Sequence, residues 1–136
     1  MKKSTIFMVL AVLTVLPNCS CDQETYSRQS RPVISVNPLL LDFGNVPLES
    51  QATRALDILN AGQIALDVSA INNSNPEAPF FILANEFSVE PESNKMLMVS
   101  FTPTEEGSFE TTLTFDSNSN NDSPTVIIKG IGVSDQ

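Results

Sequence analysis

From Pro32 onward, apolar and polar residues alternate in short runs that recur about every ten residues. Successive side chains of a strand point to opposite faces, whereas an amphipathic helix places apolar residues at spacings of three and four. Only the alternating pattern occurs in this part of the sequence, which therefore predicts an all-β domain. The predicted strands are Ile34 to Val36, Leu39 to Phe43, Arg54 to Leu59, Ile64 to Ile71, Phe80 to Leu83 with Phe87 and Val89, Met96 to Phe101, Phe109 to Phe115, and Val126 to Ile131.

Seven or eight strands in roughly 100 residues favour an antiparallel β-sandwich. The alternation also predicts which side chains face the core. The inward set is Leu56, Ile58, Ile64, Leu66, Val68, Ala70, Leu97, Val99, Phe101, Phe109, Thr111, Leu113 and Phe115. Between two of these runs, Asn60-Ala61-Gly62 is typical of a turn, since glycine tolerates positive φ and asparagine bonds the turn backbone. The domain is expected to span residues 32–133, with a tail at 134–136.

The N-terminus has the pattern of a bacterial export signal. Lys2 and Lys3 precede an apolar run from Ile6 to Leu16. At about 1.5 Å per residue this run covers roughly 16 Å, whereas a bilayer core is about 30 Å thick. We therefore predict a signal peptide over residues 1–18 rather than a membrane span.

Leu16-Pro17-Asn18-Cys19 resembles the processing site of bacterial lipoproteins. In that family, cleavage precedes a cysteine whose sulfur carries diacylglycerol, and a leucine stands three residues earlier. The resemblance assigns lipidation to Cys19, with Cys21 as the alternative. Ordinary signal cleavage that leaves a soluble exported protein is the other interpretation. A disulfide between Cys19 and Cys21 is disfavoured, since a one-residue spacer does not easily meet disulfide geometry.

Residues 19–31 follow as the lipidation site and a polar tether, which contains Tyr26 and no aliphatic side chain and is therefore predicted to be flexible. The expected location is the bacterial cell envelope, with the lipid in a membrane and the domain facing the periplasm or the cell surface. Ser20 directly after Cys19 favours the outer membrane, by analogy with enterobacterial sorting.

The composition of the chain disfavours several classes of function. Sixteen acidic residues against seven Lys and Arg give a net charge of -9, which disfavours nucleic-acid binding. There is no histidine, and both cysteines precede the domain, so no cofactor and no enzymatic activity are expected. The acidic pairs Glu105-Glu106 and Glu90-Pro91-Glu92 lie in predicted loops, without the cleft that acid–base catalysis requires.

Several motifs in order resemble the hydin-type, or ASPM-like, immunoglobulin-like domain that is related to major sperm protein. This resemblance covers Pro32 to Val133 and implies a sandwich of about seven strands, an adhesive or scaffolding role, and no catalytic residues. The motifs are Leu41-Asp42-Phe43-Gly44-Asn45-Val46, Leu56 to Gly62, Val99-Ser100-Phe101-Thr102-Pro103 with Gly107 and Phe109, Asp116-Ser117-Asn118, and Gly130-Ile131-Gly132.

Two features are candidate binding sites. Ala55, Leu59, Met96 and Met98 alternate with inward residues on two strands that are neighbours in an immunoglobulin-like fold, so they are predicted to form an apolar, partner-binding outer face. Oxygen side chains at alternate positions also give a calcium-loop spacing, although the glycine and the bidentate glutamate of such loops are missing. Those four residues are Asp116, Asn118, Asn120 and Asp122.

The sequence therefore predicts a non-enzymatic exported lipoprotein that presents one immunoglobulin-like module to a protein partner in the envelope. A soluble periplasmic or secreted domain that binds calcium or a glycan is the alternative.

Overall fold

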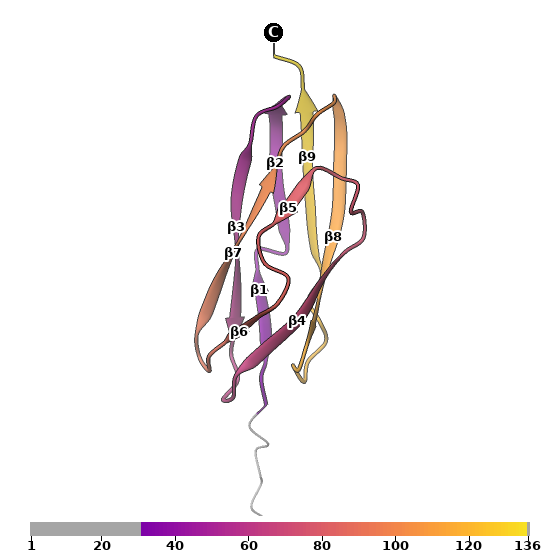
Figure 1. The fold of residues 1–136 in the computed structure, drawn as a ribbon. Helices are drawn as coiled ribbons and strands as arrows, with labels where there is room; N and C mark the ends of the chain where they lie inside the picture. The colour runs from indigo at the N-terminus through magenta and orange to yellow at the C-terminus, as the bar shows by residue number, and fades with distance from the viewer. Residues whose placement is uncertain (1–30, 136) are drawn as a thin grey trace, which may run out of the picture.

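A computed structural model describes residues 31–135, and this range contains nine β-strands and no helix (Figure 1). The predicted signal peptide, Cys19, Cys21 and the tether up to residue 30 lie outside the described residues. The strands are β1 (Ile34–Asn37), β2 (Leu40–Pro47), β3 (Ala52–Asn60), β4 (Leu66–Asn73), β5 (Phe80–Ile82), β6 (Phe87–Val89), β7 (Asn94–Phe101), β8 (Gly107–Ser117) and β9 (Val126–Val133).

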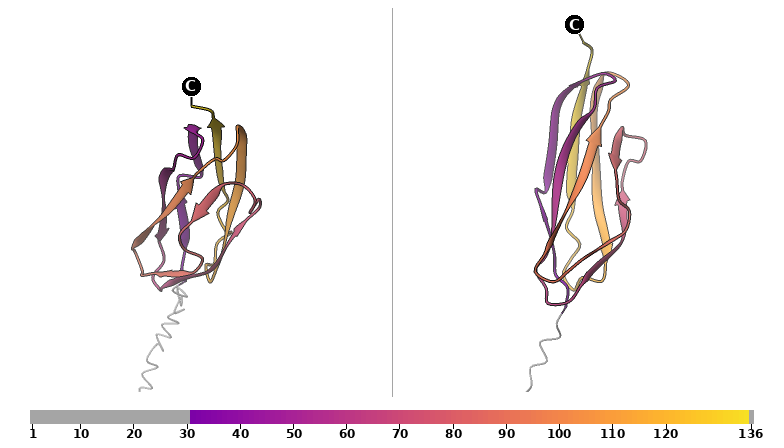
Figure 2. Two further views of the ribbon diagram at one scale, coloured as in Figure 1. Left: turned by 45° about the horizontal axis from the view of Figure 1, so that its top comes forward. Right: turned by 60° about the vertical axis from the view of Figure 1, so that its left-hand side comes forward.

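The strands form two sheets that pack face to face, which confirms the immunoglobulin-like sandwich. One sheet has the order β1-β3-β7-β5 and the other the order β2-β9-β8-β4-β6. The described chain enters the sandwich at one end and leaves at the opposite end, as the views in Figure 1 and Figure 2 agree.

The core lies between the sheets and is built by the alternation within the strands. Leu56, Ile58, Leu97, Val99 and Phe101 are all buried, as the sequence predicts for β3 and β7. Leu66, Val68, Thr111, Leu113 and Phe115 are buried in the same way from β4 and β8, while Phe109 is half-buried. Burial of aliphatic and aromatic side chains is the main stabilising contribution for a domain of this size.

One predicted core residue faces solvent instead. Ile64 is 42% exposed, because β4 begins only at Leu66. The carbonyl of Ile64 accepts a hydrogen bond of 2.7 Å from the Asn60 side chain, so this residue belongs to the turn and does not follow the strand alternation. Ala70 is half-buried, next to an irregularity in the pairing of β4 with β8.

Two aspects of the topology go beyond the sequence pattern. The segment from Phe80 to Val89 contributes β5 to one sheet and β6 to the other, so it crosses between the layers. In addition, β2 pairs with β9 in parallel, whereas the other pairs of neighbouring strands in the described range are antiparallel.

Phenylalanine rings fill one end of the core. The Phe101 ring lies 4.8 Å from that of Phe80, 5.6 Å from that of Phe43 and 5.9 Å from that of Phe109, measured between centroids. Gly130 on β9 lies against Phe101, where a Cβ would be only 2.5 Å from Cε1 of the ring. The glycine thus makes room for the central ring of the cluster.

At the other end of the domain, the side chain of Asn60 connects several segments of the chain by hydrogen bonds. Its side chain is fully buried, and its Oδ1 accepts hydrogen bonds from the backbone N–H groups of Val33 (3.3 Å) and Gly62 (2.9 Å). Its Nδ2 donates to the carbonyls of Ile64, Val89 and Glu90. The predicted turn is therefore a junction between the incoming chain, the start of β4 and the end of β6.

Candidate interaction surface

The four residues predicted to form an apolar outer face lie together on the sheet β1-β3-β7-β5. β3 and β7 are adjacent and antiparallel, and Ala55 is directly opposite Met98. Met96 is 62% exposed, Leu59 39% and Met98 37%, while Ala55 is half-buried. Side chains directly opposite on neighbouring strands are about 5 Å apart at Cβ, so Ala55 and Met98 adjoin, while Met96 is opposite Asp57 and Leu59 is opposite Asn94.

Two residues of β5 and its end extend this surface. β5 pairs with the other side of β7, where Phe81 is opposite Ser100. Phe81 is 62% exposed and Leu83 is 80% exposed. The sequence pattern does not assign them, because Phe80 to Leu83 is apolar throughout and shows no alternation. We call the six residues the apolar face; they are Ala55, Leu59, Phe81, Leu83, Met96 and Met98.

The apolar face is almost free of charge. Among the described residues at outward positions on β1, β3, β7 and β5, Asp57 alone is charged. Its Oδ1 accepts a hydrogen bond of 2.6 Å from Nδ2 of Asn94, which is on β7. Since the chain has a net charge of -9, the acidic residues are concentrated on other surfaces. Clusters of exposed apolar side chains of this kind mark interaction sites.

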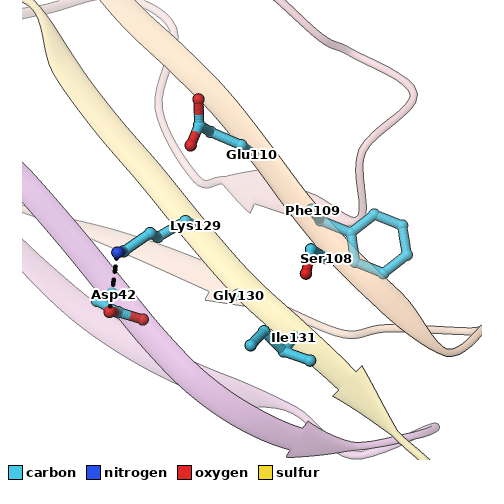
Figure 3. A pocket seen from close by; sticks show the side chains of 7 residues that line it. All are labelled: Asp42, Ser108, Phe109, Glu110, Lys129, Gly130 and Ile131. Atoms are coloured by element: carbon cyan, nitrogen blue, oxygen red, sulfur yellow. Dashed lines mark ion pairs between the residues drawn. The ribbon is translucent and has the colours of Figure 1, made fainter.

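The opposite sheet has a shallow depression of about 280 Å³ on its outer side (Figure 3). Lys129 on β9 pairs in register with Asp42 on β2 and with Glu110 on β8. Its ammonium forms an ion pair with Asp42 at 3.4 Å, as the dashed line in Figure 3 marks. The other lining residues are Ser108, Phe109, Gly130 and Ile131.

Asp42 has a lowered pKa within this depression. The backbone N–H of Gly44 donates to its Oδ1 at 2.9 Å, and this bond, followed by the Lys129 ammonium, holds the pKa of Asp42 below 3.8. Both partners favour the carboxylate form. Gly44 has a φ of 65°, so this turn within β2 suits glycine.

The four calcium-loop candidates lie at the end of β8 and in the loop to β9. Three of them accept hydrogen bonds from different parts of the domain, as Asp116 does from the Asn72 side chain, Asn118 from the backbone N–H of Asp67, and Asn120 from Arg31. The carbonyl of Asp122 accepts a bond from Nδ2 of Asn121. Within residues 31–135 no three His, Cys, Asp or Glu side chains are grouped so as to hold a metal ion. Calcium binding by these four residues stays the alternative interpretation of their spacing.

The acidic loop pairs lie apart from both surfaces. Glu105 and Glu106 are exposed between β7 and β8, and Glu106 Oε1 accepts a hydrogen bond of 3.1 Å from the backbone N–H of Ser134. Glu90 and Glu92 lie between β6 and β7, near the surface. Neither pair lines the depression described above.

Residues 32–124 match the family model of the ASH domain, which is described as "Abnormal spindle-like microcephaly-assoc'd, ASPM-SPD-2-Hydin". The chain belongs to the ASH family. The hydin-type resemblance in the sequence is thus confirmed. No curated protein sequence is significantly similar to this ASH protein.

Solved structures with the same fold have little sequence in common with this ASH domain. The ASH/PapD-like domain 7 of human CEP192 has a TM-score of 0.70 at 8% identity, covering 79% of this chain and 89% of that one. A protein of unknown function from Porphyromonas gingivalis has a TM-score of 0.63 at 15% identity, over 75% of this chain and 48% of that one. SSP-19, an MSP-domain protein of Caenorhabditis elegans, has a TM-score of 0.53 at 13% identity, over 71% and 98%.

These likenesses establish the fold. ASH domains are binding modules. None of the described residues belongs to a helix that is long and apolar enough to cross a membrane.

Proposed function

We propose that this protein is an exported lipoprotein whose ASH domain binds a protein partner through the apolar face. The observation that carries the binding role is the low charge of this face: five large apolar side chains are exposed on it, and Asp57 is the one charged residue at the described outward positions of the sheet. On the other sheet, the exposed Leu40, Ile127 and Ile131 are interspersed with charged residues. A protein partner is favoured because methionine, leucine and phenylalanine side chains adapt to and bury apolar partner surfaces.

The envelope location is supported by the sequence alone. The basic head, the apolar run and Leu16-Pro17-Asn18-Cys19 suit export, cleavage and lipid attachment at Cys19. A diacylglyceryl group with an N-terminal acyl chain gives three chains, which hold a protein stably in a membrane where one chain does not. Attachment raises the effective concentration of the domain toward partners on the same surface. The outer membrane is the proposed destination, with the domain facing the periplasm or the cell surface.

The anchor is tested by detergent-phase partition of the protein from intact cells. The wild-type protein and Cys21→Ser should enter the detergent phase, whereas Cys19→Ser should remain in the aqueous phase. The mass of the mature N-terminal peptide, read from the same samples, should include the acyl groups on Cys19. If Cys21→Ser alone loses partition, Cys21 is the modified residue. An aqueous wild-type protein without acyl mass would leave the alternative, a soluble exported domain that binds calcium or a glycan.

The binding role is tested by cross-linked pull-down from the same cells. Met96→Lys combined with Met98→Lys places two charges on the apolar face, and should abolish capture of the partner. Thr112→Lys combined with Thr114→Lys is the matched control, because both residues point outward from β8 on the other sheet. Unfolding transitions of both variants should match the wild type. Unchanged capture by the methionine variant would contradict the assignment of the face.

A further inference from the structure

We infer that the apolar face binds a protein segment in which one basic side chain, arginine or lysine, stands among apolar residues and pairs with Asp57. The inference rests on the proposed binding role and states the chemistry of the partner. Asp57 is the one charged residue at the described outward positions of this sheet, so it is the feature of the face that can select a partner by charge.

Asp57 lies among the residues of the apolar face. Met96 is directly opposite it on β7, and Ala55 and Leu59 are its outward neighbours along β3. Opposite side chains are about 5 Å apart at Cβ, and outward neighbours along a strand are about 7 Å apart. A segment that covers Met96 and Leu59 therefore also covers the carboxylate of Asp57, which belongs to a residue that is already half-buried.

The domain itself satisfies only part of this carboxylate. Oδ1 of Asp57 accepts a hydrogen bond of 2.6 Å from Nδ2 of Asn94, whereas no bond to Oδ2 is present among the described residues. The two cations on β3 and β7, Arg54 and Lys95, occupy inward register positions, and each lies over a phenylalanine ring. Neither of them neutralises Asp57 on the outer side of the sheet.

The carboxylate restricts what can cover the face. A wholly apolar segment would take the charge out of water without compensation, and an acidic segment would add repulsion. A neutral donor could bond Oδ2 but would leave the charge unbalanced, and hydrogen bonds between ionised groups are about twice as strong as neutral ones. A basic side chain supplies both the donor and the charge. The net charge of -9 also attracts such a segment at long range.

The test begins with random short peptides displayed on phage, which are selected on the full chain purified in detergent from the cells that make it. Peptides that bind the apolar face are recognised because Met98→Ser weakens their capture. These peptides should carry an arginine or lysine between apolar residues. Each is then synthesised with its basic residue and with the neutral analogue, citrulline for arginine or acetyllysine for lysine. The basic peptide should bind about tenfold more tightly, equivalent to about 1.4 kcal/mol.

Asp57→Asn identifies the charge that the peptide meets. It should weaken the basic peptide about tenfold and leave the neutral analogue unchanged. The bond from Asn94 is kept in this variant, since the new Oδ1 can still accept it. Glu110→Gln is the matched control, because it removes the same charge from an exposed position on the outer side of the other sheet. It should leave both affinities unchanged.

The outcomes separate the inference from the proposed binding role. A preference for the basic peptide that disappears in Asp57→Asn and persists in Glu110→Gln supports the inference. Peptides that bind the face without a basic residue, equal binding of the neutral analogue, or a preference that persists in Asp57→Asn overturn it and leave the binding role intact. If no peptide depends on Met98, both fail. The comparison of each peptide with its neutral analogue uses the wild-type protein and does not depend on the folding of any variant.

Discussion

The side chain of Asn121 bonds both backbone polar groups of Ile34, 87 positions away in the sequence. Its Oδ1 accepts from the Ile34 N–H at 3.0 Å, and its Nδ2 donates to the Ile34 carbonyl at 2.8 Å. The amide thus acts as a strand partner for β1 at the end where the chain enters the domain. The loop between β8 and β9 holds the first strand in place.

Asn121→Ala should therefore destabilise the domain by about 1–3 kcal/mol, because the Ile34 carbonyl loses this donor and the Ile34 N–H keeps only its longer bond of 3.3 Å to Ser119 Oγ. The free energy of unfolding in urea measures this loss. Asn85→Ala is the matched control, since Asn85 is exposed and no side-chain bond to it is present among the described residues; its effect should stay within about 0.5 kcal/mol. Equal stability of the two variants would show that the loop does not secure β1.

Asn60 allows a test of whether a hydrogen-bond donor is required at this buried position. Asn60→Ala should cost at least about 2 kcal/mol, since buried carbonyls and N–H groups lose their partners. Asn60→Asp should cost as much or more, although it preserves shape. Its second oxygen would face the carbonyls of Ile64, Val89 and Glu90, to which Nδ2 now donates. Urea unfolding of both variants measures the effect. A well-tolerated aspartate would mean that size, rather than donation, matters at this position.

The sequence pattern was sufficient to predict which side chains of the regular strands face the core. On β3, β7 and β8 strict alternation predicted that Leu56, Leu97 and Leu113 face the core and that Met96 faces outward, as the structure shows. Successive side chains of a strand point to opposite faces, so the burial of one face determines the direction of every side chain. The pattern was insufficient where alternation stops. The uniformly apolar run from Phe80 to Leu83 does not reveal which side chains face outward, so two members of the apolar face were missed.

Long-range relationships were also beyond the sequence pattern. Period two specifies the faces of a strand but not its neighbours, so the parallel pairing of β2 with β9 and the crossing between β5 and β6 could not be predicted. The pattern places Asn60 in a turn, and its bonds to residues near Val33 and Val89 depend on segments that only the fold brings together.

Calcium should not stabilise this domain. Asp116, Asn118 and Asn120 have the alternate spacing of a calcium loop, yet their side-chain oxygens accept hydrogen bonds from β4 and from Arg31. A calcium site needs six or more oxygens that converge at about 2.4 Å, so binding would have to break these bonds. Thermal unfolding with calcium or with a chelator should give the same midpoint. A ligand at about 100 times its Kd would add about 2.7 kcal/mol, and a calcium-dependent rise on that scale would restore the calcium hypothesis.

Gly130 should not tolerate a methyl group. A Cβ there would be 2.5 Å from Phe101 Cε1, and Phe101 is fully buried against Phe80 and Phe43. Gly130→Ala should thus cost about 1–3 kcal/mol by displacing the ring. Phe101→Leu removes the contact, so the double variant should be more stable than the sum of the two losses predicts, by at least about 0.5 kcal/mol. Urea unfolding of all four proteins measures this coupling, and strict additivity would exclude the clash as the cause.

Asp42 should contribute a component of stability that depends on pH. Its folded-state pKa lies below 3.8, first because of the Gly44 N–H and then because of Lys129. The unfolded state therefore binds the proton more readily, and stability from this group is present above 3.8 and is lost as the pH falls through the lower folded-state pKa. Asp42→Asn should lack this component, so the two proteins should differ more in free energy of unfolding at neutral than at acid pH.

Urea titrations at intervals between roughly pH 6 and pH 2.5 measure the change. Lys129→Gln should reduce the acid-dependent component of the wild type without removing it, since the Gly44 N–H remains as the main cause of the lowered pKa. Added salt should affect the Lys129 part alone, because an exposed ion pair is screened whereas the Gly44 hydrogen bond is local. A difference between wild type and Asp42→Asn that stays constant with pH would refute the assignment of this shift.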